Sequence, residues 1–430
     1  MATSLQELAE ILQQLLIIDA NQLGRSSGFI QRQRKLTGSS FVQALVFGWQ
    51  ANPHASLEEL CQAACASGVT ISPQGLQERL NERGAAFLKQ MLERSLSYMV
   101  QAEAGAIAFL KPFKGVYLQD STTISLPLSL EHEWPGTGNQ TGGSAALKVQ
   151  TVLDYQQGQL RMQLVQARQH DCPLQTTDLP RGALRLADTG YFKVAVFQDL
   201  DQRGVAWVAR IPARVGVWQS ERTVSLATWL AHQEQAVIDV AVELTAQRLA
   251  CRLIAVRVPE AVAQQRRDRA LADAKDRGQP LRPATLALCD WTVIATNLPP
   301  HALTVDDALL LLRLRWQIEL LFKLWKQTQA LHHWHSARPA QLLCELYAKL
   351  LLVVIQHWLL LLGCWDEPQR SLSKAVQVLR KHAFHLVTAL PDPAALLEAL
   401  ATILPSLKRC LIQKRRARPA TFQLLARARP

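Results

Sequence analysis

The stretch GVYLQDST, residues 115–122, decides the fold. It is a short apolar run that starts at a glycine and passes into a polar segment, a pattern that predicts a buried β-strand ending before Asp120. The stretch LRLADTG, residues 184–190, repeats the pattern and places Asp188 at the end of a second strand. In α/β folds, side chains at strand ends are typical positions for chemistry. The two stretches therefore predict an α/β fold with an aspartate at each of two strand ends.

More strands are expected around these two. Residues 146–155 and 160–168 are predicted to form a hairpin, because Gly158 stands in the polar segment between them. Residues 291–297 are predicted to form a later strand. The strands expected from about residue 205 to 259 have no comparable acidic strand end, and we interpret them as an inserted β-rich unit.

The first hundred residues show a helical pattern. Residues 56–59, Ser-Leu-Glu-Glu, spell a capping box that opens one helix. Ser72 and Pro73 supply an N-cap and a proline at the first helical position, which predicts a second helix through Phe87. Two short helices joined by a tight turn suit DNA binding and suit ordinary helical packing equally well.

Length and composition place the chain among folded, basic proteins. Its 430 residues are enough for two or three domains with a large core. Its 49% hydrophobic and 19% charged residues argue against wholesale disorder. Subtracting 35 acidic from 47 basic residues leaves a net charge of +12. This excess predicts a polyanionic partner, first a nucleic acid and second a membrane surface.

Several classes of protein are disfavoured. The N-terminus has acidic residues where a secretory signal would have a basic and then an apolar stretch, so we expect an intracellular protein. The eight cysteines are sparse and irregular, which argues against a disulfide framework or a zinc ribbon. The apolar residues 346–365 are interrupted by Lys349, Gln356 and His357, which favours a buried helix over a membrane span.

Three other stretches have more than one interpretation. Residues 264–283 hold six basic and three acidic residues and are either a solvated face or a DNA-contacting element. Residues 408–429 hold eight basic residues and no acidic one, as in a nonspecific DNA clamp or a flexible tail. Residues 332–335, His-His-Trp-His, are expected to form a surface or DNA-facing turn, because the sequence places no cysteine or carboxylate close by to complete a metal site.

A long helix is expected to begin near Ala308, capped by Asp306 and Asp307, in a leucine-rich stretch that runs through Cys344. Glu319 is the one acidic residue within it. At about 100° per residue, Arg315, Glu319 and Lys326 project from one stripe of this helix. A lone carboxylate among leucines is costly unless it is paired or bound to a metal. The stripe is therefore either a buried ion cluster or part of a site for metals and phosphates.

Phosphodiester chemistry would explain such a grouping. Two Mg²⁺ ions about 4 Å apart can activate the attacking oxygen and stabilise the leaving one, and these hard ions require carboxylate ligands. Asp120 and Asp188 are the natural partners of Glu319, because each is expected to end a strand before a small polar residue.

These motifs together resemble a DDE insertion-sequence transposase of the family named IS four. The resemblance rests on Asp120-Ser121-Thr122, Ala187-Asp188-Thr189-Gly190-Tyr191, Thr296-Asn297-Leu298 and Arg315-x3-Glu319-x6-Lys326. The family signature is Tyr-x2-Arg-x3-Glu-x6-Lys, and here Leu312 replaces the tyrosine, which removes one expected phosphate or base contact. The resemblance covers about residues 110–345 and, more loosely, the helical N-terminal part.

The resemblance implies an enzyme that binds the terminal inverted repeats of its own element, hydrolyses the DNA at the ends and transfers the 3′ ends to target DNA. Asp120, Asp188 and Glu319 would be catalytic and would hold two Mg²⁺ or Mn²⁺ ions. Arg315 and Lys326 would bind DNA phosphates. The partners would be double-stranded DNA and a second copy in a homodimeric synaptic complex, in a prokaryotic cytoplasm near the nucleoid and without a membrane.

Some members of the family flip a base onto a tryptophan. Trp207, Trp218 and Trp291 lie in or beside the expected insertion, and the sequence does not choose among them. Each is also compatible with a place in the core.

The expected layout has three parts. They are a helical N-terminal DNA-binding domain at residues 1–104, an RNase H-like catalytic domain at 105–345 with a β-rich insertion at about 205–290, and a helical C-terminal region with a basic tail at 346–430. Three alternatives stay open: a domesticated or inactive transposase that binds DNA, which the missing tyrosine favours, a stand-alone RNase H-like nuclease or resolvase, and a membrane-associated protein.

Overall fold

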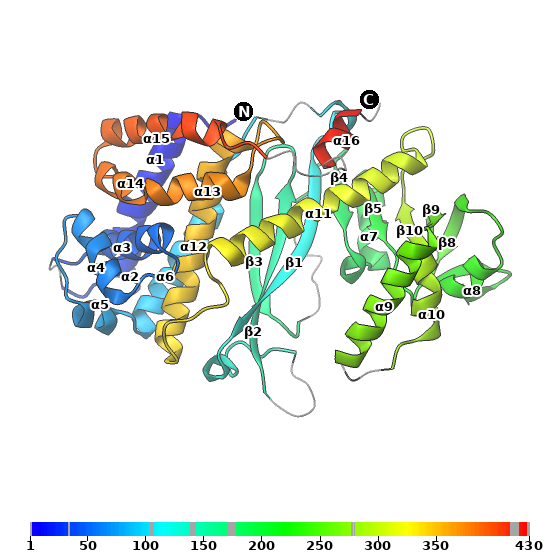
Figure 1. Cartoon of the computed structure of the whole chain (residues 1–430), viewed down its shortest axis with the longest axis horizontal. Helices are drawn as coiled ribbons and strands as arrows, with labels where there is room; N and C mark the ends of the chain where they lie inside the picture. The colour runs from blue at the N-terminus through cyan, green and yellow to red at the C-terminus, as the bar shows by residue number, and fades with distance from the viewer. Residues whose placement is uncertain are drawn as a thin grey trace.

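The protein has a mixed α/β architecture built on one ten-stranded sheet, with a helical part at one end (Figure 1). The structure is a computed structural model that describes residues 2–32, 35–103, 107–137, 143–169, 178–276, 278, 280–412 and 421–427. The strands are β1 Val116–Leu126, β2 Ala145–Asp154, β3 Leu160–Gln166, β4 Leu184–Ala187, β5 Ala206–Arg210, β6 Gly216–Gln219, β7 Arg222–Ser225, β8 Val237–Leu244, β9 Leu249–Arg257 and β10 Trp291–Thr296.

Helices precede, cover and follow this sheet. They are α1 Leu5–Gln13, α2 Ala20–Ser26, α3 Gly38–Ala51, α4 Leu57–Ala66, α5 Pro73–Arg79, α6 Glu82–Ser97, α7 Val194–Gln202, α8 Leu226–Ala231, α9 Glu260–Asp276, α10 Pro283–Ala287, α11 Val305–Thr328, α12 Pro339–Cys364, α13 Leu372–Lys381, α14 Ala383–Ala389, α15 Pro393–Lys408 and α16 Thr421–Arg427. The first six pack with α12 to α15 at one end of the molecule (Figure 1).

The strands expected in the insertion continue the main sheet. The strand order is β3-β2-β1-β4-β5-β10-β9-β8-β6-β7. Strand β4 pairs in parallel with both β1 and β5, and β10 then pairs antiparallel with β5 and β9. The β-rich unit is thus joined to β1, β4 and β5 through backbone hydrogen bonds from β5 to β10.

The hairpin and the short strand before Asp188 form as the sequence predicts. Strands β2 and β3 pair antiparallel, and Gly158 in their connection has a φ of 73°, which glycine adopts without steric cost. Strand β4 ends at Ala187.

The prediction that the first strand ends before Asp120 is wrong. Strand β1 continues through Asp120 to Leu126, because β2 pairs with it along its whole described length, from Tyr117↔Asp154 to Leu126↔Ala145. What ends at this level is the parallel pairing with β4, whose last pair is Gln119↔Ala187. Asp120 therefore lies where β1 loses one of its two neighbours.

The N-terminal helices follow the predicted caps with one difference. Ser56 and Glu59 form the capping box of α4, and Ser72 caps α5 with Pro73 in its first turn. The second predicted helix does not continue to Phe87, because Leu80 leaves the helical conformation at a ψ of 65°. Asn81 then accepts hydrogen bonds from two backbone amides and caps a new helix, α6.

The leucine-rich stretch from residue 308 to 344 forms one helix and the start of a second. Helix α11 ends at Thr328, and Ala330 has a φ of 46°, which breaks the helical path before α12 begins at Pro339. The start differs from the prediction: Thr304 is the N-cap, and Asp307 sits at the third position of its capping box. Asp306 and Asp307 lie inside the first turn, where their charge complements the helix dipole.

Helix α12 is the one described helix that is long and apolar enough to cross a membrane. In this fold it is a core helix, because 94% of its most apolar window is buried, and it contacts α3, α6 and α15.

The sheet has a separate core on each face. Residues of even number in β1 and β4, such as Leu118 and Leu186, belong to the same core as Leu314 and Ile318 of α11. Tyr117 belongs to a second core, on the other face, with α7. Figure 1 shows α11 crossing the sheet from the β10 side toward α12. Asp120 has an even number, so its side chain points to the face that α11 covers.

Candidate active site

Asp120 and Asp188 are neighbours across β1 and β4. In the parallel register Gln119 pairs with Ala187, so the next residue on each chain is an aspartate at the same level of the sheet. The side chain of Asp120 faces α11, and Asp188 lies close enough for its charge to act on Arg315 of that helix. The two carboxylates also interact electrostatically, because the negative charge of Asp188 raises the pKa of Asp120. The topology thus brings together two carboxylates that are 68 residues apart in the sequence, 188 less 120.

Arg315 of α11 lies between Asp120 and Glu319. Its Nη1 donates to Oδ2 of Asp120 at 2.8 Å, and its Nη2 donates to Oε1 of Glu319 at 2.7 Å. The guanidinium is 3% exposed, whereas the side chains of Asp120 and Glu319 are 16% and 26% exposed. The buried arginine therefore orders two carboxylates that each keep one side toward solvent.

The charges of this group depend on each other. Burial raises the pKa of Asp120 to about 6, against the opposing effect of the Arg315 charge. Burial by itself would lower the pKa of Arg315, but the charges of Asp188, Asp120 and Glu319 outweigh burial and raise it. Arg315 thus stays charged, while Asp120 holds a proton more readily than an ordinary aspartate.

The charge of the group fits a divalent cation. Three ionised carboxylates and one guanidinium leave two negative charges uncompensated. Within the described ranges, Oδ1 of Asp188 is buried and has no hydrogen-bond partner. A buried oxygen of this kind normally has a hydrogen-bond partner. Oδ1 of Asp188 is therefore the oxygen of this group that is most available to a metal ion.

The geometry is not yet that of a metal centre. Among the residues that the structure describes, no three His, Cys, Asp or Glu side chains lie close enough to hold a metal ion. Arg315 instead bonds Oδ2 of Asp120 and Oε1 of Glu319. The predicted stripe on α11 is therefore in part an ion cluster, one of the two interpretations that the sequence left open.

Lys326 lies farther along the same helix. Lys326 is seven positions after Glu319, which corresponds to about 10 Å along the axis of an α-helix. Its side chain is half-buried, and this burial lowers its pKa. Leu312, at the position of the signature tyrosine, packs partly buried against the core below α11.

Comparison with known proteins decides the family. The transposase DDE domain family matches residues 111–355, more than half of the chain. The chain belongs to this family. The match spans β1, β4 and α11, the three elements that carry Asp120, Asp188 and Glu319.

Individual relatives extend the match beyond that domain. The transposase for insertion sequence element IS231F of Bacillus thuringiensis subsp. israelensis is 26% identical over 436 residues, covering 93% of this chain and 90% of the relative. The one for IS231C of Bacillus thuringiensis subsp. berliner is 27% identical and covers 78% and 75%. The one for IS1151 of Clostridium perfringens is 24% identical and covers 79% and 77%.

The recognition of a DDE insertion-sequence transposase from its motifs is thus confirmed. The chain is a DNA transposase, and DNA is its partner. Membership of the family implies a metal-dependent nuclease or transferase that uses divalent ions.

Within this transposase, the motif Thr296-Asn297-Leu298 has a structural explanation. The side-chain oxygen of Asn297 accepts from the backbone N–H of Trp207 at 2.9 Å, and its Nδ2 donates to Val205 O and to Asp201. Thr296 Oγ1 donates to Trp207 O at 2.7 Å. These contacts join the end of β10 to β5 and α7 beside the catalytic strands.

The three candidate tryptophans differ in exposure. Trp207 is fully buried, with its ring centroid 4.3 Å from that of Phe197. Trp291 is also buried, with Arg257 over its ring. Trp218 is half-buried in the insertion. Of these three, Trp218 alone has a ring that a base could reach without unpacking a core.

Sequence reasoning missed Trp316, which directly follows Arg315. It is 45% exposed and lies three residues before Glu319, on the adjoining face of α11. Lys323 places its ammonium 5.9 Å from the centre of the ring. An exposed indole flanked by a cation is suited to stacking on a nucleobase. Its position inside the signature was the available signal, but the search for tryptophans was confined to the insertion.

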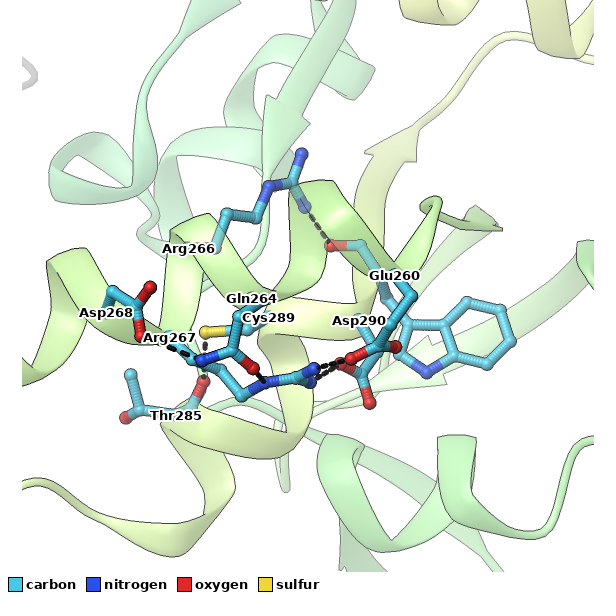
Figure 2. Close-up of polar contacts among 9 residues, drawn as sticks. Glu260, Gln264, Arg266, Arg267, Asp268, Thr285, Cys289 and Asp290 are labelled. Carbon is cyan, nitrogen blue, oxygen red and sulfur yellow. Dashed lines mark hydrogen bonds and ion pairs between the residues drawn. The ribbon is translucent and has the colours of Figure 1, made fainter.

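The basic stretch at 264–283 belongs largely to α9, and its arginines are engaged within the insertion. Figure 2 shows Arg267 paired with Glu260 and Asp290. Arg266 donates to Trp291 O at 2.8 Å and to Thr292 Oγ1 at 3.1 Å. These two arginines are therefore half-buried and engaged within the insertion, whereas the choice between a solvated face and a DNA-contacting element stays open for the rest of the stretch. Residues 413–420 and 428–429 of the basic C-terminal run lie outside the described residues.

The histidines at 332–335 meet a carboxylate that the sequence placed ten residues later. His335 contacts Oε1 of Glu345 through Nδ1 at 2.8 Å, and the same oxygen accepts from Lys349 at 2.6 Å. The expectation of a turn after the helix is confirmed. His335 lies at the surface as expected, but the expectation that no carboxylate lies close by is wrong, because Glu345 of α12 contacts its ring.

Proposed function

We propose that this chain is an active transposase that hydrolyses DNA at the terminal inverted repeats of its insertion sequence and joins the 3′ ends to target DNA. Asp120, Asp188 and Glu319 are the proposed catalytic residues and metal ligands. Arg315 and Lys326 are the proposed phosphate-binding residues. Pairing two ends before cutting requires at least two protomers, so the working form is proposed to be a homodimer on DNA, inside a prokaryotic cell.

The observation that carries this proposal is the gathering of three family carboxylates around one buried arginine. An ion cluster that served stability alone would be charge-balanced, because an uncompensated buried charge is costly. This group has an excess of two negative charges and an unpaired buried oxygen on Asp188. It lies where the β1–β4 pairing ends, open enough to leave Glu319 26% exposed.

The strand order supports the RNase H-like assignment. Strands β3-β2-β1-β4-β5 form a block in which β2 is antiparallel and β4 and β5 are parallel to β1. The proposed division keeps residues 1–104 as the helical DNA-binding domain, 105–345 as the catalytic domain with its insertion at about 205–290, and 346–430 as the helical C-terminal region.

Each residue has a proposed part in the reaction. Mg²⁺ or Mn²⁺ would supply the Lewis acid that activates water or a 3′ hydroxyl and stabilises the leaving oxygen. Asp120, Asp188 and Glu319 would hold the ions in place. Arg315 would release one carboxylate and turn a donor toward the scissile phosphate, which matches the planar fork of a guanidinium. Lys326 would bind the backbone about two turns farther along, and Trp316 would stack on a base between them.

The test is cleavage of a labelled duplex that carries the inverted repeat of the native element. Wild-type protein is expected to leave a 3′ hydroxyl at the repeat boundary with Mg²⁺ or Mn²⁺ and to leave the duplex intact with EDTA. Asp188→Asn is expected to abolish cleavage while binding of the end survives. Asp199→Asn, on the exposed surface of α7, is the matched control and should cut normally.

Tight binding by well-folded wild-type protein without a cut in either metal would favour the second candidate, a domesticated DNA-binding protein. The tyrosine replacement at Leu312 and the bridging of two carboxylates by Arg315 are the observations that favour it. Cleavage without joining to a target would favour a stand-alone nuclease. Full cleavage by Asp188→Asn would refute the proposed site.

A further inference from the structure

Arg252 is a buried arginine of β9 that no part of the proposed catalytic group uses. It is 7% exposed and points to the face of the sheet that α11 covers. Its Nε donates to Oδ1 of Asp239 at 2.6 Å and its Nη2 to Oδ2 at 2.7 Å, so the two side chains form a bidentate pair across β8 and β9. This pair holds the plane of the guanidinium fixed.

The remaining nitrogen of Arg252 reaches outside the insertion. Its Nη1 donates to the backbone oxygen of Leu303 at 2.6 Å and approaches that of Leu298 at 3.4 Å. Both oxygens belong to the connection between β10 and α11. Leu303 is 1% exposed and directly precedes Thr304, the N-cap of α11. The guanidinium of Arg252 therefore fixes the backbone of the connection that leads into α11.

We propose that Arg252, oriented by Asp239, is a positioning residue that fixes the start of α11 and thereby the placement of Arg315 and Glu319 over the two aspartates. The inference rests on the proposed function for its catalytic readout. It assigns the β-rich unit a role in the active site even though it contributes no residue to the carboxylate group.

The geometry of a helix explains why its start matters. A slip of one residue moves every side chain of α11 by about 1.5 Å along the axis and turns it by about 100°. Such a slip would carry Glu319 away from Arg315 and from the end of β4. The capping box of Thr304 and Asp307 sets where the helix begins in the sequence, whereas the Arg252 contact sets where that beginning lies in space.

The hairpin that carries Arg252 supplies its own control. Glu243 and Arg248 form a second ion pair between the ends of β8 and β9, with Nη2 and Oε2 2.8 Å apart. That pair is largely solvent-exposed, and neither of its side chains has a hydrogen bond to the connection before α11 among the described contacts. Glu243→Gln and Asp239→Asn therefore each replace a carboxylate with an amide on the same hairpin. Of these two residues, Asp239 is the one that is linked through Arg252 to the connection before α11.

The experiment measures amide hydrogen exchange of the metal-free, full-length protein and cleavage of the labelled end. In Arg252→Ala, amides of residues 305–312 are expected to exchange at least about tenfold faster, while those of residues 318–325 change less. Cleavage should slow roughly 10- to 100-fold, the range for groups that orient ligands, with end-binding affinity within about twofold of wild type. Arg252→Lys should stay impaired, because one ammonium cannot serve Asp239 and Leu303 together.

Asp239→Asn keeps the fold testable if Arg252→Ala does not purify, and it should show the same pattern more weakly. Glu243→Gln should match wild type. The proposal is overturned if α11 exchanges normally in the Arg252 and Asp239 variants, if exchange rises uniformly over the whole chain, or if Glu243→Gln behaves like Asp239→Asn. Failure of wild-type protein to cut DNA would refute the proposed function alone, because the exchange pattern does not depend on cleavage.

Discussion

Two consecutive helices carry ion pairs of the same spacing, and only one of them lies in the proposed active site. Helix α11 pairs Arg315 with Glu319, and α12 pairs Glu345 with Lys349, each four residues apart. The pair on α12 is closed: Glu345 is 5% exposed and Lys349 is fully buried. The pair on α11 keeps its carboxylate 26% exposed.

The surroundings of the two pairs differ in charge balance. Around Lys349, its ion pair with Glu345 comes with a hydrogen bond to His333 O at 3.2 Å and with the rings of Trp49 and Trp334 within 6 Å. Trp334 in turn donates to Ser125 O of β1, so this group joins the N-terminal helices to the catalytic sheet. Around Arg315 three carboxylates compete for one guanidinium. A balanced cluster is suited to hold parts together, whereas an unbalanced one is suited to bind a cation.

The largest expected effect separates the two glutamates by activity. Glu319→Gln should reduce the rate of end cleavage roughly ten-thousand-fold, because about 5 kcal/mol of transition-state stabilisation is lost with a metal ligand. Its free energy of unfolding should change little, since Arg315 keeps its bond to Asp120. Single-turnover cleavage and urea unfolding of the same preparation test this. Appreciable cutting by this variant would remove Glu319 from the site.

The second effect is one of stability. Glu345→Gln leaves Lys349 buried without its counter-ion, which should lower the free energy of unfolding by about 3–5 kcal/mol. The double variant Glu345→Leu, Lys349→Met should regain most of this loss, because apolar side chains can replace a buried pair. Cleavage per folded molecule should stay near wild type in both. If the double variant folds normally but does not cut DNA, Glu345 and Lys349 contribute to cleavage as well as to stability.

The smallest expected effect is a dependence on pH. The pKa shifts have opposite signs for Asp120 beside Arg315 and for Glu345 beside Lys349. Burial raises the pKa of Asp120 to about 6, so protons compete with the metal below that pH. Between pH 7 and 5 metal affinity and cleavage should fall about tenfold, since roughly one Asp120 carboxyl in eleven is ionised at pH 5. Cleavage at several metal concentrations checks this, because excess metal should restore the rate. A rate that is independent of metal concentration at pH 5 would contradict it.

The α12 cluster should keep its contribution to stability over that range. Glu345 is buried, which would raise its pKa, but His335 and Lys349 outweigh burial and lower it. A lowered carboxyl pKa contributes stability that is lost only as the pH falls below the ordinary value of 4.5. The hydrogen bond to Glu345 raises the pKa of His335, whose contribution is complete below 6.5 and is lost as the pH rises through the raised value. Urea unfolding at pH 5 and 8 should therefore show the effect of His335→Ala more clearly at pH 5.

Local signals in the sequence were sufficient for much of the fold. The capping box of Ser56 and Glu59, the hairpin around Gly158 and the strand that ends at Ala187 depend on contacts within a few residues, and they formed as predicted. The errors occurred where distant segments decide. Strand β1 runs past Asp120 because β2, which starts at Ala145, pairs with it.

The sequence by itself determined the family, because two aspartates after apolar runs and one Arg-x3-Glu-x6-Lys helix resemble a DDE transposase, and comparison with known proteins confirmed that family. It could not say that Arg315 would bridge Asp120 and Glu319, because helical periodicity gives direction around one axis and says nothing of what lies opposite. Only the tertiary structure decided the register that sets Asp120 beside Asp188, the closed cluster on α12, and the contact by which Arg252 holds the start of α11. Each of these depends on strand pairing or helix packing between segments tens to hundreds of residues apart.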